Sequence, residues 1–173
     1  ILSRCQLMKF MPYSLEELEA YIIEKFGIEK SIANQYARLS EGNLSMAVSL
    51  AKEGEKDLST NLFNWLRTSY KGDAEEIQSF VLEFTSQNLD HQIQFIEYGL
   101  HFFQNLYLWM VTNGSHHNMT THEIDVAQKM KNILTAENIE KLTSELNQTI
   151  TYILRNANPK LNIFSTTIRV GDI

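Results

Sequence analysis

The chain repeats apolar residues at intervals of three and four positions along most of its length. These intervals match the turn of an α-helix, so each stretch gathers its apolar side chains on one helical face. Turn and capping residues divide the pattern into segments that begin near positions 14, 29, 43, 55, 73, 88, 121, 135 and 158. We therefore predict an all-α fold.

Several of these segments carry explicit end signals. Ser14 stands three residues before Glu17, which is the spacing of a capping box, and Gly27 after the first segment can adopt a positive φ. Short polar side chains that can accept a backbone N–H mark the other helix starts. The other predicted N-caps are Asn43, Asp73, Thr121 (for a helix from Glu123 to Ile133), Thr135 (for a helix to about Asn156) and Asn158, which precedes Pro159.

The longest segment, from Asn88 or Asp90 to about Asn113, is apolar around most of its circumference. A helix of this kind is surrounded by other helices. We predict that it is the central helix of its own bundle, and a contact with another subunit is compatible with that role. Its polar residues step by three and four, so they share one narrow face; they are Asp90, Gln94, Glu97, His101 and Gln104 or Asn105.

The chain of 173 residues is long enough for one domain of ordinary size or for two small ones. The helical phase restarts between Gly54 and Glu55, and we place the domain boundary there. We expect a three-helix unit before this boundary and a helical bundle over residues 55–173 after it.

The composition is that of a globular protein in a reducing compartment. Hydrophobic residues make up 43% of the chain and charged residues 21%, and Cys5 is its single cysteine, so no internal disulfide can form. The longest apolar stretch, residues 99–111, has 13 residues, which is too short to cross a bilayer. No signal-peptide pattern is visible. We expect a cytoplasmic protein without a membrane partner.

The net charge of −6 is spread unevenly. Residues 1–54 hold six basic and seven acidic residues, a balance of −1, and residues 55–173 hold nine and fourteen, a balance of −5. A protein that binds duplex DNA needs clustered Lys and Arg to neutralise phosphates, and neither part has such a cluster. If the protein works on DNA, other subunits make most of the contact.

No motif for a self-contained active site is present. The chain lacks a phosphate-binding loop, a Gly-x-Ser-x-Gly elbow, a His-Glu-x-x-His helix and a Cys-x-x-Cys pair. The carboxylate pairs at 16–17 and 75–76 lie at helix starts, where the helix dipole explains them. His116, His117 and His122 have no neighbouring ligands to complete a metal shell, so we expect no metal.

The first charged residue, Arg4, stands between Ser3 and Cys5 in a segment without a capping signal. An isolated arginine of this kind is most often a solvated or salt-bridged surface residue. The alternative is that it projects toward an anion on a neighbouring protein, because the guanidinium group stays charged and donates to phosphate oxygens in pairs. The run Ser-Arg-Cys-Gln, followed by apolar residues and Pro12, resembles the SRC motif of clamp-loader subunits, the AAA+ proteins that open sliding clamps at replication forks. In that family the motif closes the nucleotide-binding domain, and its arginine reaches the ATP of the next subunit.

Residues 36–47 resemble the sensor-2 stretch of an AAA+ lid. In members that hydrolyse nucleotide, this stretch carries an arginine that contacts ATP, and the matching position here is Ser45. Neither neighbour of Ser45 carries a charge. Gly42 and Asn43 are explained in any case as a helix stop and an N-cap. A lid without its ATP-sensing arginine resembles the delta-prime family of bacterial clamp-loader subunits, which offer an arginine to a neighbour and hydrolyse no ATP themselves.

The resemblance implies the C-terminal portion of such a subunit of the DNA polymerase III clamp loader. Residues 1–54 would hold the end of an AAA+ core and a three-helix lid, and residues 55–173 a collar bundle, whose last motif at 156–161 is similar to the chain end of collar domains. The chain itself would not be an enzyme and would bind no cofactor. Arg4, in the motif with Ser3 and Cys5, would act in trans on ATP-Mg bound to the neighbouring subunit.

The implied partners are the ATPase (gamma/tau) and delta subunits, and through the complex the sliding clamp and primer-template DNA. Two alternatives stay open. One is a fragment of the ATP-hydrolysing gamma/tau-type subunit, which an arginine at position 45 would have marked. The other is a helical adaptor module unrelated to ATP, in which Arg4 is an ordinary surface residue.

Overall fold

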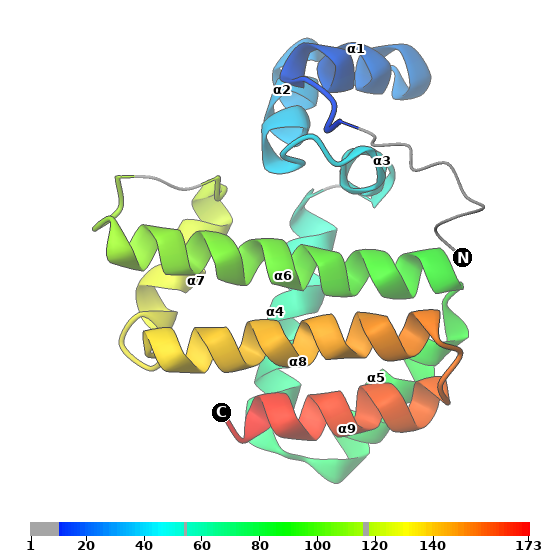
Figure 1. Ribbon diagram of the computed structural model, residues 1–173, viewed down its shortest axis with the longest axis vertical. Coiled ribbons are helices and arrows are strands. Elements are labelled where there is room, and N and C mark those ends of the chain that lie inside the picture. Colours follow the sequence, from blue (N-terminus) through cyan, green and yellow to red (C-terminus); the bar gives the residue numbers. More distant parts are fainter. Residues whose placement is uncertain (1–10, 54, 116–117) are drawn as a thin grey trace, which may run out of the picture. The chain divides into compact units, whose positions relative to one another are not determined.

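The computed structural model describes residues 11–53, 55–115 and 118–173. Within these ranges the chain forms nine helices and no strand, which confirms the all-α prediction (Figure 1). The described residues divide into two compact units, with the division between Lys52 and Glu53. The helices are α1 (Leu15–Phe26), α2 (Lys30–Leu39), α3 (Leu44–Glu53), α4 (Glu55–Lys71), α5 (Ala74–Ser86), α6 (Leu89–Val111), α7 (Thr121–Met130), α8 (Ala136–Leu154) and α9 (Pro159–Gly171).

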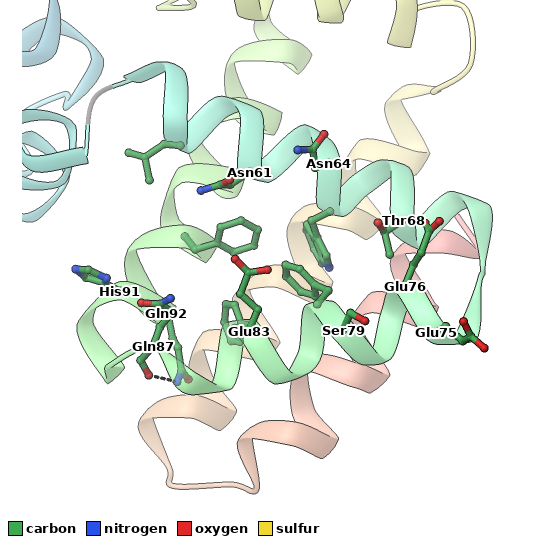
Figure 2. Close-up of a pocket in the computed structure, with 15 residues that line it drawn as sticks. Asn61, Asn64, Thr68, Glu75, Glu76, Ser79, Glu83, Gln87, His91 and Gln92 are labelled. Carbon is green, nitrogen blue, oxygen red and sulfur yellow. Dashed lines mark hydrogen bonds between the residues drawn. The ribbon is translucent and has the colours of Figure 1, made fainter.

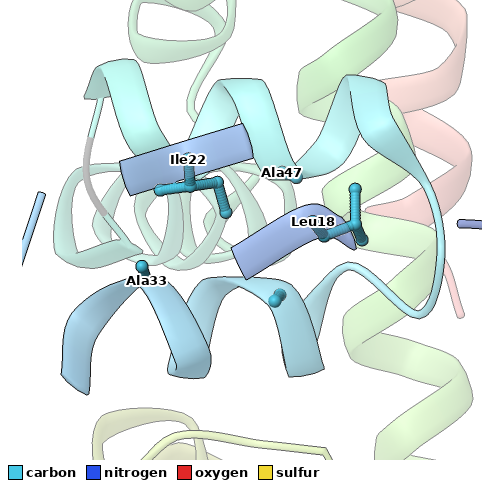
Figure 3. Close-up of a cluster of buried hydrophobic side chains, with 5 residues drawn as sticks. Leu18, Ile22, Ala33 and Ala47 are labelled. Atoms are coloured by element: carbon cyan, nitrogen blue, oxygen red, sulfur yellow. The ribbon is translucent and has the colours of Figure 1, made fainter. Parts of the chain in front are cut away.

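The first unit closes around a small core of two large side chains and several alanines. Leu18 and Ile22 of α1 are fully buried, and they lie with Ala33 of α2 and Ala47 of α3 in one cluster, which Ala37 completes (Figure 3). Alanine leaves room for helices to approach closely, so three short helices can bury these two side chains. Such a core is small for an independent unit, since each large apolar side chain contributes about 1.5–3 kcal/mol.

The loop between α2 and α3 is held by the segment that precedes α1. The backbone N–H of Tyr13 donates to the carbonyl of Gly42 at 3.1 Å. Gly42 has a φ of +85°, and a Cβ built on it would lie 2.6 Å from the Cβ of Pro12. Both the left-handed backbone and the close approach require glycine here. The hydrogen bond from Tyr13 and the close contact with Pro12 therefore hold this loop in place.

Most of the predicted capping signals are confirmed. Ser14 and Glu17 form both bonds of a capping box, and Gly27 ends α1 with a φ of 66°. Asn43 accepts the N–H of Met46 at 3.2 Å. The predicted caps of α5, α8 and α9 also accept backbone N–H groups; they are Asp73, Thr135 and Asn158, the last with Pro159 in the first turn.

Four predicted helix limits differ from the structure by one to three residues. Thr120, not Thr121, caps α7, because it stands three residues before Glu123 and the two form a capping box. That helix ends at Met130 rather than Ile133. The long helices α6 and α8 end two residues before Asn113 and Asn156, which take positive φ values of 50° and 54°. Asparagine tolerates this left-handed conformation, which stops a helix.

In the second unit, α6 packs along α8, and α8 packs along α9, each antiparallel to the one before (Figure 1). Helix α4 packs on α5, α6 and α9. A Cβ on Gly99 of α6 would lie 3.2 Å from Leu146 of α8 and 3.3 Å from Leu62 of α4, so α6 lies against both helices. The indole N–H of Trp65 donates to the hydroxyl of Thr167 at 3.0 Å, which joins α4 to α9 inside the core.

The predicted polar face of α6 is only partly exposed. Asp90 and Gln104 face solvent, but Asn105 is buried and donates to the carbonyl of His101 at 3.1 Å. Near the end of the helix the pattern reverses, because Tyr107 and Leu108 are about half exposed. None of the helices in the described ranges combines the length and apolar character needed to cross a membrane.

Candidate functional site

The predicted trans-acting site, Arg4 with Ser3 and Cys5, lies outside the described residues. The part of the predicted site that the structure does describe is the start of α3. Ser45 is the second residue of this helix, and its side chain is exposed. The fixed loop at Gly42 sets the direction in which α3 begins.

Ser45 contributes a neutral hydroxyl in the first turn of α3. Its backbone carbonyl accepts the hydroxyl of Ser49 at 3.2 Å, a bond within the helix. The nearest arginine in the sequence, Arg38 of α2, donates to the side-chain oxygen of Asn34 on its own helix at 2.9 Å. The structure thus has the predicted turn at Gly42 and Asn43 followed by a helix, with the exposed Ser45 in its first turn.

A second candidate site is a groove in the second unit, bounded by α4, α5 and the start of α6 (Figure 2). Its volume is about 780 Å³. Four aromatic side chains form its floor: Trp65, Phe80, Phe84 and Phe95. Polar and acidic side chains form its rim; among them are Asn61, Asn64, Glu75, Glu76, Glu83 and His91. We call these residues together the aromatic groove.

The floor is a connected set of ring contacts. Trp65 stacks on Phe80 with ring centroids 5.9 Å apart, and Phe95 meets the edge of Trp65 at 5.6 Å. Phe84 meets Phe95 edge-on at 5.7 Å. Trp65, Phe84 and Phe95 are buried, whereas Phe80 is only partly buried. Aromatic pairs in these geometries stabilise by about 0.5–1.5 kcal/mol beyond their buried area. Trp65, Phe84 and Phe95 therefore belong to the core, and Phe80 is the floor ring that is partly open to the groove.

The rim is acidic. Three glutamates line the groove, and none of the lysines and arginines whose side chains are described does. Lys71 forms an ion pair with Glu76, whose hydrogen bond and charge raise the pKa of the Lys71 ammonium group. Glu75 and Glu83 are exposed, and Figure 2 shows the carboxylate of Glu83 projecting from α5 into the groove toward α4. The groove thus offers aromatic surface with negative charge beside it.

A third feature, the buried carboxylate of Glu123, was not predicted. Glu123 is 1% exposed, and its two oxygens accept the hydroxyl of Tyr98 at 2.6 Å and the N–H of Thr120 at 2.9 Å. Because both oxygens have donors, the carboxylate ties α7 to α6 and is explained by structure. The spacing from Thr120 could have predicted the capping role, but no local spacing predicts the tyrosine 25 residues away.

Glu97 of α6 is in a different situation. It is partly buried, and its Oε2 atom has no hydrogen-bond partner among the described residues. Burial raises the pKa of this carboxyl above its ordinary value. Glu97 was predicted to lie on the narrow polar face of the helix, and in the structure its side chain loses much of its water.

The contacts of His122 are those of a residue that packs between helices. The Nδ1 atom of His122 lies 3.1 Å from the hydroxyl of Ser59, and the ring packs on Phe63 with centroids 5.5 Å apart. His116 and His117 lie outside the described residues. Among the residues that the structure does describe, no three His, Cys, Asp or Glu side chains come together as a group that could hold a metal ion.

Helix α9 carries an exposed apolar stripe. Leu161, Phe164 and Ile168 are spaced by three and four residues, and their exposed fractions are 69%, 42% and 40%. Ile163 and Val170 of the same helix are buried and face the bundle. All five residues are apolar in the sequence, and the structure divides them between two faces of the helix. We call the three exposed residues the α9 stripe.

Comparison of the chain with protein-family models, with curated proteins and with solved structures finds no match in any of the three. The function must therefore be argued from the residues and their arrangement.

Proposed function

We propose that the chain is the C-terminal part of a bacterial clamp-loader subunit of the delta-prime type. Residues 1–54 would comprise the end of an AAA+ core with its SRC motif and a three-helix lid, and residues 55–173 a collar. The subunit would not hydrolyse ATP. It would supply Arg4 in trans to the ATP-Mg site of the neighbouring gamma/tau subunit, and it would join that subunit and the delta subunit in a ring that loads the sliding clamp onto primed DNA.

The observation that carries the proposal is the start of α3, taken with the sequence at the front of the chain. The Gly42–Asn43 turn is followed by the exposed Ser45, and in the sequence resemblance Ser45 matches the position at which an ATPase lid carries arginine. A neutral hydroxyl on a short side chain cannot stabilise a distant phosphate charge. This favours a subunit that supplies an arginine to the ATP site of its neighbour over a subunit that hydrolyses ATP in its own site.

Arg4 has the chemistry that the trans role requires. During phosphoryl transfer, negative charge spreads over the equatorial oxygens of the transferred group, and a guanidinium donates to two of them at once. An arginine supplied to such a site from a neighbouring protein increases the rate about 10³–10⁵-fold, or about 4–7 kcal/mol of barrier. One residue at a subunit boundary can therefore make hydrolysis depend on ring assembly.

The α9 stripe supports the assembly part of the proposal. Three apolar side chains at 40–69% exposure on one face of a helix match the seam that a partner helix would cover. Beside them a hollow of about 520 Å³ lies between α8 and α9, with Tyr152 and Phe164 among its lining. Burial of one such leucine against a partner contributes about 1.5–3 kcal/mol.

The test is reconstitution with purified gamma/tau and delta subunits, followed by size-exclusion chromatography. We expect the full-length protein to enter the complex, and Leu161→Gln to weaken its incorporation about 10–100-fold. Leu82→Gln is the matched control, because Leu82 is also an exposed leucine of a helix, at 51%. Failure of the unsubstituted protein to enter the complex would support the adaptor alternative instead.

A further inference from the structure

We infer that the aromatic groove is a docking site for a basic amphipathic helix of a partner protein. Apolar side chains of that helix would rest on Phe80, the floor ring that is partly exposed, and its Lys or Arg side chains would face Glu75 and Glu83. The inference uses only the second unit and does not depend on the clamp-loader proposal.

The length of the groove favours a helix. Along α5 its rim runs from Glu75 to Gln87, and along α4 from Leu58 to Thr68. At about 1.5 Å per residue these rims extend about 18 Å and 15 Å, the length of three turns of a partner helix. The volume of about 780 Å³ accommodates several apolar side chains in a row. Recognition of a helix by a groove between two helices uses anchors at intervals of three and four residues.

The charge selects the kind of helix. Among the described side chains, the three charged residues other than histidine that line the groove are glutamates, and of these Glu76 forms an ion pair, with Lys71. A partner with carboxylates or phosphates would meet like charge, whereas Lys and Arg would be attracted and steered to the site. A guanidinium that reaches the floor would also contact aromatic faces. The groove therefore favours a basic partner over an acidic peptide or a nucleic acid.

The chain carries its own reporter for the test. Trp65 and Trp109 are its two tryptophans, and only Trp65 lines the groove. The variant Trp109→Phe leaves Trp65 as the single tryptophan, whose emission is excited selectively at wavelengths that tyrosine does not absorb. The probe is a capped 14-residue peptide with leucine at intervals of three and four and arginine at the other outward positions, and the matched peptide carries glutamate in place of every arginine.

We expect saturable changes in Trp65 emission with the arginine peptide, a Kd at least fivefold weaker at 500 mM than at 50 mM salt, and no binding of the glutamate peptide. Glu83→Arg, made in the Trp109→Phe background, should weaken binding about tenfold, as expected when an attractive pair becomes a repulsive one. Glu140→Arg is the control, because it makes the same charge change at an exposed position of α8 outside the groove. Thermal melts of each variant check folding.

Three results would overturn the inference. The first is an unchanged Trp65 signal up to millimolar peptide, and the second is equal binding of the two peptides. The third is an equal loss from Glu83→Arg and Glu140→Arg, which would show general attraction to an acidic protein. If Glu83→Arg lowers the melting temperature, Glu83→Gln keeps the test intact, with an expected weakening of about two- to fivefold.

Discussion

The hydroxyl of Tyr98 donates a 2.6 Å hydrogen bond to the carboxylate of Glu123, and both side chains are at most 2% exposed. The bond joins α6 to the first turn of α7 across 25 residues of sequence. The other carboxylate oxygen caps its own helix through the N–H of Thr120. A single glutamate thus fixes both where α7 begins and where it lies on the bundle.

Tyr98→Phe should therefore destabilise the chain by about 1–3 kcal/mol, because it leaves a buried acceptor without its donor. Urea denaturation monitored by circular dichroism measures the loss. The control is Tyr107→Phe, which removes the same hydroxyl from an exposed position of α6 and should change the free energy of unfolding by less than about 0.5 kcal/mol. Equal effects of the two substitutions would contradict the assigned role of the bond.

Gly42→Ala should destabilise the first unit more than Gly27→Ala does. Both glycines have positive φ, at 85° and 66°. Alanine is strained in this left-handed conformation, so each substitution should lower the free energy of unfolding by about 1 kcal/mol. Only at Gly42 would the new Cβ also meet a neighbour, Pro12, at 2.6 Å. Hydrogen exchange of amides in α1 and α2 measures the stability of this unit. Similar loss of protection in the two variants would show that the segment before α1 does not hold the loop.

Glu97→Gln should stabilise the protein at pH 7. Burial raises the pKa of Glu97 in the folded state above its ordinary value of 4.5, so the folded state holds this proton more tightly than the unfolded state. Stability from this group is present below pH 4.5 and is lost as the pH rises through the folded pKa. The amide does not ionise and avoids this loss.

The measurement is the free energy of unfolding of both proteins at pH 7 and at pH 4. The advantage of Glu97→Gln should be present at pH 7 and absent at pH 4. Glu140→Gln, at an exposed position of α8, is the control and should show no such dependence. A glutamine variant that is less stable than the parent at pH 7 would mean that Glu97 gains a favourable interaction from its charge.

Helix starts could be predicted from the sequence where the cap and its partner are neighbours. Ser14 with Glu17 and Asn158 with Pro159 are contacts within one turn, so their spacing carries all the information. Thr120 and Thr121 compete for the same role, and only the distance to Glu123 decides between them. That signal was present in the sequence, and the prediction chose the wrong threonine.

The aromatic groove could not be predicted in this way. The aromatic residues of the groove lie on three helices and follow one another at intervals of fifteen residues, at Trp65, Phe80 and Phe95. Each looks like an ordinary core residue in its own segment. Their common surface arises from how α4, α5 and α6 pack, which depends on contacts that no periodicity describes. The two faces of α9 were hidden for the same reason, because apolar spacing alone does not tell which face meets the bundle.

The central claim, a subunit that acts on its neighbour's ATP, is tested most directly by the rate of ATP hydrolysis in the reconstituted clamp loader with clamp and primed DNA. Arg4→Ala in the full-length protein should lower the rate at the adjoining site by about 10³-fold or more while the complex stays assembled, and Arg155→Ala, an exposed arginine after α8, should not. An assembled complex in which Arg4→Ala hydrolyses ATP as fast as the parent would contradict the claim.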